Sequence, residues 1–134
     1  MSNLHKTFFY FDFSLFSFGS TPQKVNKIQF LFLQNLPNLK RMDLSNCKYL
    51  TETPIFNCTP NLERLDFTGC TNLVKVHPSI GHLTKLVFLS LQNCSSLVNL
   101  DFGSVSNLSS LRVLRLSGCT KLEKTPNFMG ASNL

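Results

Sequence analysis

The sequence predicts one α/β domain in which short parallel strands stack into a right-handed solenoid. Three observations predict it: a cysteine that recurs every 23–25 residues, the same apolar positions around each cysteine, and proline in three of the four segments that follow. Periods of about 20–50 residues are typical of folds in which each unit buries its apolar edge only against its neighbours. The period therefore indicates the fold class before any local structure is assigned.

The repeated frame has the form L-x-x-L-x-L-x-x-C-x-x-L, and its first copy begins at Leu39. Met42 and Phe67 are positions where another apolar residue replaces leucine. The last two leucines of L-x-x-L-x-L alternate with outward-facing residues, which is strand periodicity over a short segment. We therefore expect four short parallel strands, near residues 41–46, 64–69, 88–93 and 113–118.

The second half of each repeat has apolar positions of its own, among them Phe56 and Ile80, each six residues before the next frame begins. Three of the four segments place proline eight residues before the next frame: Pro54, Pro78 and Pro126. Proline among Asn, Thr and Ser suits short 3-10 turns or irregular backbone better than long helices. The expected architecture is a leucine-rich-repeat solenoid, with the parallel sheet on its concave side and mostly irregular or 3-10 returns.

The chain divides into a Phe-rich segment, 1–35, and a repeat region, 36–134. The repeat region holds four leucine-rich repeats, at about 39–61, 62–85, 86–110 and 111–133, and Leu134 is the first residue of a fifth.

Residues 1–30 do not fit the frame, although a preceding repeat would place its strand near 15–26. Phe9, Phe11 and Phe13 alternate with polar residues, so a strand is possible there. A signal peptide is another interpretation, but Asp12 interrupts its apolar region and no A-x-A-like cleavage site follows.

Charge and hydropathy exclude two classes of protein. The chain has 13 Lys and Arg against 7 Asp and Glu, a net charge of +6. The basic residues are scattered, whereas nucleic-acid-binding proteins cluster them on one face, so we expect no nucleic-acid partner. The longest apolar stretch, Phe8 to Phe18, has 11 residues, and a membrane span needs about 18 or more.

The cysteines and histidines do not form a recognisable catalytic or metal-binding pattern. Cysteines 47, 70, 94 and 119 occur once per repeat, which would align them in a column rather than a tetrahedron. We expect them to be buried, reduced and weakly hydrogen-bonded to the turn backbone.

Cys58 lies outside the frame and is the one candidate for a reactive thiol. His5, His77 and His82 lack a partner at a recurring spacing, and the last two are expected at the solvated edge of a return. We expect no enzyme activity, no metal and no cofactor.

Residues between the leucines project outward from the predicted sheet and form columns across the repeats. The candidate protein-binding face consists of Arg41, Asp43, Arg64, Asp66, Phe88, Gln92 and Arg115. Arginine and aromatic residues are over-represented at interface positions that dominate binding energy. The alternative is a solvated face whose ion pairs satisfy one another.

Three phrases carry a family resemblance: LPNLKRMDLSNCKYLTETP, TPNLERLDFTGCTNLVKVHPSIGHLTKL and LRVLRLSGCTKLEKTPNF. From Leu36 to Leu134 the chain resembles the leucine-rich-repeat region of plant intracellular nucleotide-binding disease-resistance proteins, especially the class with an N-terminal Toll/interleukin-1-receptor (TIR) domain. The resemblance implies a cytoplasmic, non-catalytic recognition module. It would act in defence and signal transduction, and its partner would be a pathogen effector, a host target or another domain of the parent receptor. No G-x-x-x-x-G-K-[ST] phosphate loop occurs, so we expect no nucleotide binding by this segment. The TIR domain of the family has no counterpart either, so the resemblance implies that the chain is a fragment or a truncated gene product.

Two other functions stay open. One is an extracellular leucine-rich-repeat protein that binds a ligand, for which three N-x-[ST] sequons begin at Asn57, Asn93 and Asn107. However, extracellular plant repeats typically carry asparagine at the position that cysteine occupies here. The other is a truncated receptor remnant without independent activity.

Overall fold

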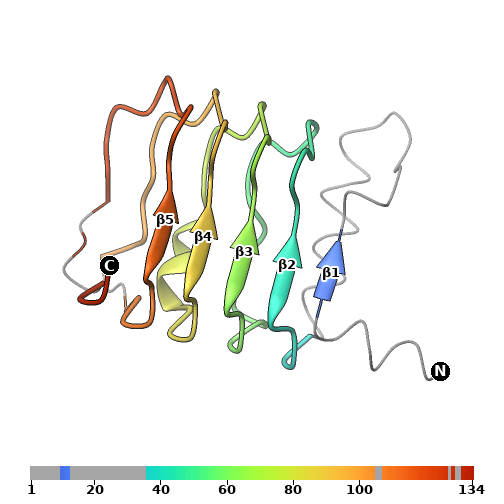
Figure 1. Cartoon of the computed structure of the whole chain (residues 1–134), viewed down its shortest axis with the longest axis vertical. Helices are drawn as coiled ribbons and strands as arrows, with labels where there is room; N and C mark the ends of the chain where they lie inside the picture. Colours follow the sequence, from blue (N-terminus) through green and yellow to red (C-terminus); the bar gives the residue numbers. More distant parts are fainter. Residues whose placement is uncertain (1–9, 13–35, 105–106, 127, 129–130) are drawn as a thin grey trace.

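The computed structural model describes residues 10–12, 36–104, 107–126, 128 and 131–134. Its strands form one parallel sheet whose spatial order is the order of the sequence (Figure 1). The strands are β1 (Tyr10–Asp12), β2 (Arg41–Asp43), β3 (Arg64–Asp66), β4 (Phe88–Ser90) and β5 (Val113–Arg115). A 3-10 helix, η2 (Pro78–His82), lies in the segment between β3 and β4.

The register of the sheet is the register of the repeat. Met42 pairs with Leu65, Leu65 with Leu89, and Leu89 with Leu114. Each strand has three residues and is shorter than the six expected, but hydrogen bonds to the next repeat continue beyond it. The N–H of Asn46, for example, donates to the Thr68 carbonyl at 2.7 Å. The four expected strands are confirmed in position and in parallel direction.

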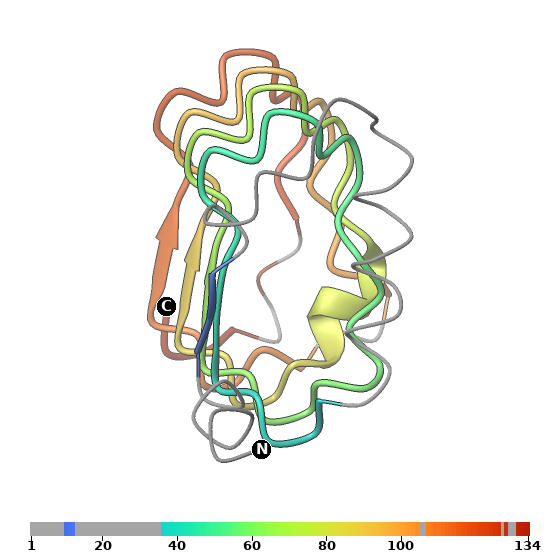
Figure 2. The same cartoon turned by 90° about the vertical axis from the view of Figure 1, so that its right-hand side faces the viewer.

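The apolar frame residues fill the interior between the sheet and the return segments. Figure 2 shows successive passes of the chain superposed around this interior, with the strands on one side and η2 on the other. Leu65 and Leu89 are fully buried, as is Leu111. Thr59 takes a leucine position of the frame and is also fully buried, because its hydroxyl donates to the Phe56 carbonyl at 3.2 Å. Burial of the frame residues is the main stabilising term expected for such a stack.

A sharp turn follows each of β2 to β5 and reaches the frame cysteine. The residue before the cysteine has a positive φ in all four turns: Asn46 (60°), Gly69 (77°), Asn93 (60°) and Gly118 (80°). Glycine and asparagine are the residues that adopt this left-handed conformation at lowest cost. The alternation of N-C and G-C in the sequence therefore encodes one turn geometry four times.

The returns correct the α/β assignment, because the described residues contain no α-helix. Instead, parallel bridges join Glu52 to Lys75, Lys75 to Asn99, and Asn99 to Lys124. Together with η2, they agree with the expected irregular or 3-10 returns.

The neighbour of β2 on the side away from β3 is β1, and Phe11 pairs with Met42 in parallel register. The position near 15–26 that the repeat spacing suggested for a preceding strand lies outside the described residues. The strand indicated by alternating phenylalanines is confirmed for Tyr10–Asp12. The signal-peptide interpretation and His5 concern residues outside the described ones.

Candidate protein-binding face

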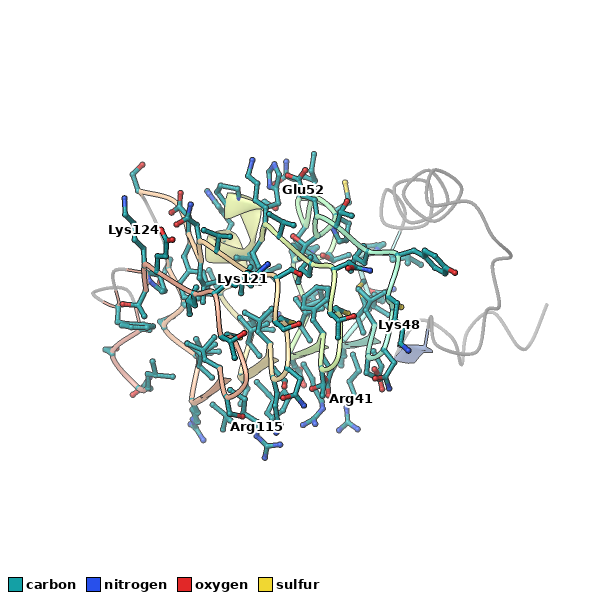
Figure 3. All side chains as sticks on the ribbon, turned by 90° about the horizontal axis from the view of Figure 1, so that it is seen from above. Arg41, Lys48, Glu52, Arg115, Lys121 and Lys124 are labelled. Atoms are coloured by element: carbon teal, nitrogen blue, oxygen red, sulfur yellow. The ribbon has the colours of Figure 1, made fainter. Side chains whose placement is uncertain are left out.

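The outer sheet face comprises the outward-directed residues of β2 to β5: Arg41, Asp43, Arg64, Asp66, Phe88, Ser90, Val113 and Arg115. Alternation along the strand separates them from the core, since Arg64 is exposed, Leu65 is buried and Asp66 is half-buried. Figure 3 shows Arg41 and Arg115 projecting from the sheet side of the molecule, whereas Glu52 projects from the opposite side. The structure thus brings the predicted arginines, aspartates and phenylalanine onto one face.

Phe88 lies at the centre of this face, between two arginines. The guanidinium carbon of Arg64, on β3, is 3.7 Å from the centroid of the Phe88 ring, and that of Arg115, on β5, is 5.3 Å away. Both distances are within the range of cation–π attraction. The two side chains cover the ring, which is only 9% exposed despite its outward position. We call this group the Arg64–Phe88–Arg115 cluster.

The two aspartates of the face are engaged in their own turns. Asp43 Oδ1 accepts hydrogen bonds from the backbone N–H and the hydroxyl of Ser45. Asp66 Oδ1 accepts the backbone N–H of Thr68 at 2.9 Å. These contacts stabilise the turn after the strand, which is a usual role of Asp two residues before a backbone donor.

Gln92, the remaining predicted site residue, is half-buried at the end of β4. Its carbonyl accepts the N–H of Gly69 at 2.8 Å, so its backbone has a structural role. Ser90 is 1% exposed in spite of its outward position, and its hydroxyl forms a 2.7 Å hydrogen bond with the Thr68 hydroxyl. The sequence argument did not predict this bond or the placement of two arginines on one ring. Both depend on side chains that reach across neighbouring strands.

Charged residues of the first repeats pair across the stack. Lys40 Nζ lies 3.4 Å from Glu63 Oε1, and Lys75 Nζ lies 3.6 Å from Glu52 Oε1. All four side chains are well exposed, so each pair stabilises the fold by at most about 1 kcal/mol. In the same two columns the fourth repeat has Arg112 and Lys124, for which no carboxylate partner occurs within the described ranges.

The frame cysteines form the expected column, with one correction. Cys70 and Cys94 are fully buried, but Cys47 and Cys119, in the first and fourth repeats, are partly exposed. Each thiol of the column after Cys47 donates to a carbonyl of the preceding repeat: Cys70 to Leu44 (3.1 Å), Cys94 to Phe67 (3.2 Å) and Cys119 to Leu91 (3.0 Å).

Burial controls the chemistry of these thiols. Desolvation raises the pKa of Cys94 to about 12, and it also raises the pKa values of Cys70 and Cys119. Because the thiolate is the nucleophile, these thiols are poorly reactive at neutral pH. Cys58 is exposed and free, in agreement with its position outside the frame.

His77 does not lie at a solvated edge, as the sequence suggested, but caps η2. Its Nδ1 accepts the Ser79 N–H at 3.1 Å, and its own N–H donates to the Thr53 hydroxyl at 2.7 Å. The Ser79 hydroxyl, 2.9 Å from His77 Nδ1, in turn accepts the buried N–H of Phe56. His82 is exposed, as expected. His77 therefore links two repeats structurally.

The part of the chain that the structure describes contains no group of three or more His, Cys, Asp or Glu side chains placed to hold a metal ion. It also contains no helix with the length and apolar character that crossing a membrane requires.

No family model matches the chain, but several curated proteins do. TMV resistance protein N of Nicotiana glutinosa is 42% identical over 97 residues, which is 72% of this chain. Disease resistance proteins RPP4 and RPS4B of Arabidopsis thaliana are 45% and 36% identical over 100 and 98 residues. The chain spans about 8% of the length of each of these relatives. Since the identity extends over nearly three quarters of the chain, the chain belongs to the family of plant disease-resistance proteins.

Proposed function

We propose that the chain is a non-catalytic protein-recognition module of a plant disease-resistance receptor of the TIR-containing, nucleotide-binding, leucine-rich-repeat class. In this proposal the stacked repeats form a right-handed leucine-rich-repeat solenoid with the sheet on its concave side. The module acts in the cytoplasm, in the defence response and signal transduction, and binds neither nucleotide nor nucleic acid. Its partner is a pathogen effector, a host protein or another part of the parent receptor.

One observation carries the proposal: the Arg64–Phe88–Arg115 cluster on the outer sheet face. An aromatic ring flanked by arginines combines the residue types enriched at protein interfaces. The return side instead has exposed Lys and Glu residues, of which Glu52 and Lys75 pair with each other. The similarity to disease-resistance proteins supports the defence role, and the cluster supports recognition through the sheet face.

Site-directed photocrosslinking tests this function. A photoreactive phenylalanine analogue is placed at Val113, which is exposed on the outer sheet face, or at Val74, which is exposed outside it. The purified chain is irradiated in leaf extract. We expect discrete protein adducts from position 113, suppressed by excess unlabelled chain but not by an excess of the Arg64→Glu, Arg115→Glu double variant. Equal adducts from both positions, or none from position 113, would contradict the proposal.

A further inference from the structure

We propose that the Arg64–Phe88–Arg115 cluster binds a carboxylate of an extended acidic segment of a partner protein, with Asp or Glu next to an aliphatic side chain. This inference rests on the proposed function and specifies the chemistry of the partner. It follows from the geometry of the two guanidinium groups, from the charges around them and from the apolar residues beside them.

Two positive charges of the cluster share one aromatic ring. Stacking on Phe88 holds the Arg64 guanidinium carbon 3.7 Å from the ring centroid, and Arg115 approaches the same centroid to 5.3 Å. The electron-rich face of the ring offsets part of each charge, but the two cations still repel one another. A stacked guanidinium keeps its N–H donors in its own plane, available to a planar acceptor. A carboxylate between the two groups would reduce the repulsion and accept these donors.

No described carboxylate forms an ion pair with Arg64 or Arg115. Asp66 lies two residues from Arg64 on the same face, but its Oδ1 accepts the Thr68 N–H, and no ion pair joins it to Arg64. Arg115 likewise has no ion pair within the described ranges. A carboxylate that pairs with these arginines would therefore come from outside these residues.

Charge is distributed unevenly along the stack of repeats. In the first two repeats, Lys40 pairs with Glu63, and Glu52 pairs with Lys75. The fourth repeat carries four basic residues, Arg112, Arg115, Lys121 and Lys124, against one acidic residue, Glu123. No ion pair involves any of the four within the described residues. The β4–β5 end is thus positive, and an acidic partner is its electrostatic complement.

The surroundings of the cluster favour a protein segment over a phosphate-rich ligand. Val113 lies next to Phe88 in the sheet and is 38% exposed, and Val87 is 37% exposed. Such apolar surface beside the cluster suits an aliphatic side chain next to the carboxylate. Asp43 and Asp66 lie on the same face and would repel the continuous negative charge of a nucleic acid. The combination favours an acidic peptide segment.

Peptide titration of the full 134-residue chain tests the inference. The probe is the acetylated and amidated pentapeptide Gly-Glu-Leu-Glu-Gly, and its counterpart Gly-Gln-Leu-Gln-Gly lacks the charges. Binding is followed through the side-chain Nε–H signals of arginine in NMR spectra of the ¹⁵N-labelled chain. We expect the glutamate peptide to shift the Arg64 and Arg115 signals saturably, and the glutamine peptide to leave them unchanged. Arg64→Gln or Arg115→Gln should weaken binding about tenfold, since each removes charge-assisted hydrogen bonds.

Two matched variants distinguish binding at the cluster from non-specific attraction of the peptide to positive charge. Lys124→Gln removes the same charge from the return side and should change the affinity less than twofold. Phe88→Leu keeps every charge but removes the ring that orients the guanidinium groups, and should weaken binding about fivefold. Unchanged affinity in Phe88→Leu, or equal losses in Lys124→Gln and Arg64→Gln, would overturn the inference. Thermal melting confirms that each variant remains folded.

Other outcomes are equally decisive. If inorganic phosphate shifts both arginine signals as strongly as the glutamate peptide at equal concentration, the cluster is a general anion site and the inference is wrong. If neither peptide moves these signals while position 113 still forms specific photocrosslinks, the carboxylate inference fails and the proposed function stands. If the crosslinks are also absent, both fail.

Discussion

The side chain of Asn46 covers the Cα of Gly69, which occupies the same turn position one repeat later. A Cβ added to Gly69 would collide with Oδ1 of Asn46, and Asn93 stands in the same relation to Gly118. All four residues have positive φ. Asparagine and glycine therefore alternate along the stack for two reasons: each tolerates the turn, and the glycine leaves space for the asparagine before it.

This relationship predicts an unequal cost for two glycine substitutions. Gly69→Ala should destabilise the fold by more than the roughly 1–2 kcal/mol that a left-handed alanine costs, because the Asn46 side chain must also move. Gly103→Ala is the matched control, since Gly103 has a similar φ of 81° but its added Cβ would approach no atom closer than 3.5 Å. Denaturant unfolding measures both.

A second substitution checks the cause. In an Asn46→Gly background, the additional cost of Gly69→Ala should fall to that of Gly103→Ala, because the obstructing side chain is gone. If Gly69→Ala and Gly103→Ala lower the free energy of unfolding equally in the native background, the contact with Asn46 does not contribute to the cost of Gly69→Ala.

Thiol labelling should separate the five cysteines into classes. At pH 8 and in the native state, we expect Cys58 to react first and Cys47 and Cys119 more slowly, in the order of their exposure. Cys70 and Cys94 should react only as fast as the chain unfolds, since both are fully buried. Mass spectrometry after timed quenching assigns the sites. Rapid native labelling of Cys94 would contradict its placement in the core.

The same thiols predict how stability depends on pH. The pKa of Cys94 is about 12 in the folded chain, above the value of about 8.5 expected when the chain is unfolded. The unfolded state therefore loses the proton first, and the free energy of unfolding should fall as pH rises from about 8.5 towards 12. Cys94→Ala should reduce this slope, because it removes one of the buried thiols whose pKa is raised. Urea unfolding at pH 8 and pH 10 measures the difference.

Two equivalent frame leucines should differ in their contribution to stability. Leu89→Ala should cost about 2–5 kcal/mol, because Leu89 is fully buried between two repeats. From the frame alone, Leu114→Ala would be expected to cost the same. In the structure, Leu114 packs against the core but is only partly buried, so the loss should be smaller. Chemical denaturation of the two variants tests this order. Equal losses of stability would show that Leu114 is covered as well as Leu89.

Self-association is expected for the isolated chain. Within the described residues, β5 is the last strand of the sheet, and Leu114, Leu116 and Leu122 near it are only partly buried. An open parallel edge with apolar neighbours favours pairing with another chain. Light scattering should show oligomers that increase with concentration, and a version extended by further repeats should be monomeric. A monodisperse monomer at all concentrations would show that the edge is protected.

The predictions that succeeded rest on the repeat. A period of 23–25 residues sets which residues lie side by side, because parallel strands in register place equivalent positions in columns. The places of β2 to β5, the leucine interior, the cysteine column and the outward direction of Arg41, Arg64 and Phe88 all follow from that rule. The residue pattern was sufficient to predict these features because every repeat has the same spacing of apolar residues and cysteine.

Features that occur only once in the chain could not be predicted from the repeat and were found only in the tertiary structure. The pairing of β1 with β2 depends on a segment outside the period, and the cap by His77 depends on a serine two residues later and on contacts from the preceding repeat. The enclosure of Phe88 depends on where two flexible arginine side chains settle near one ring. Sequence spacing by itself determined which residues share a column and a face. Only the packed structure decided which side chains meet across columns, because side-chain conformation responds to neighbours that differ from one repeat to the next.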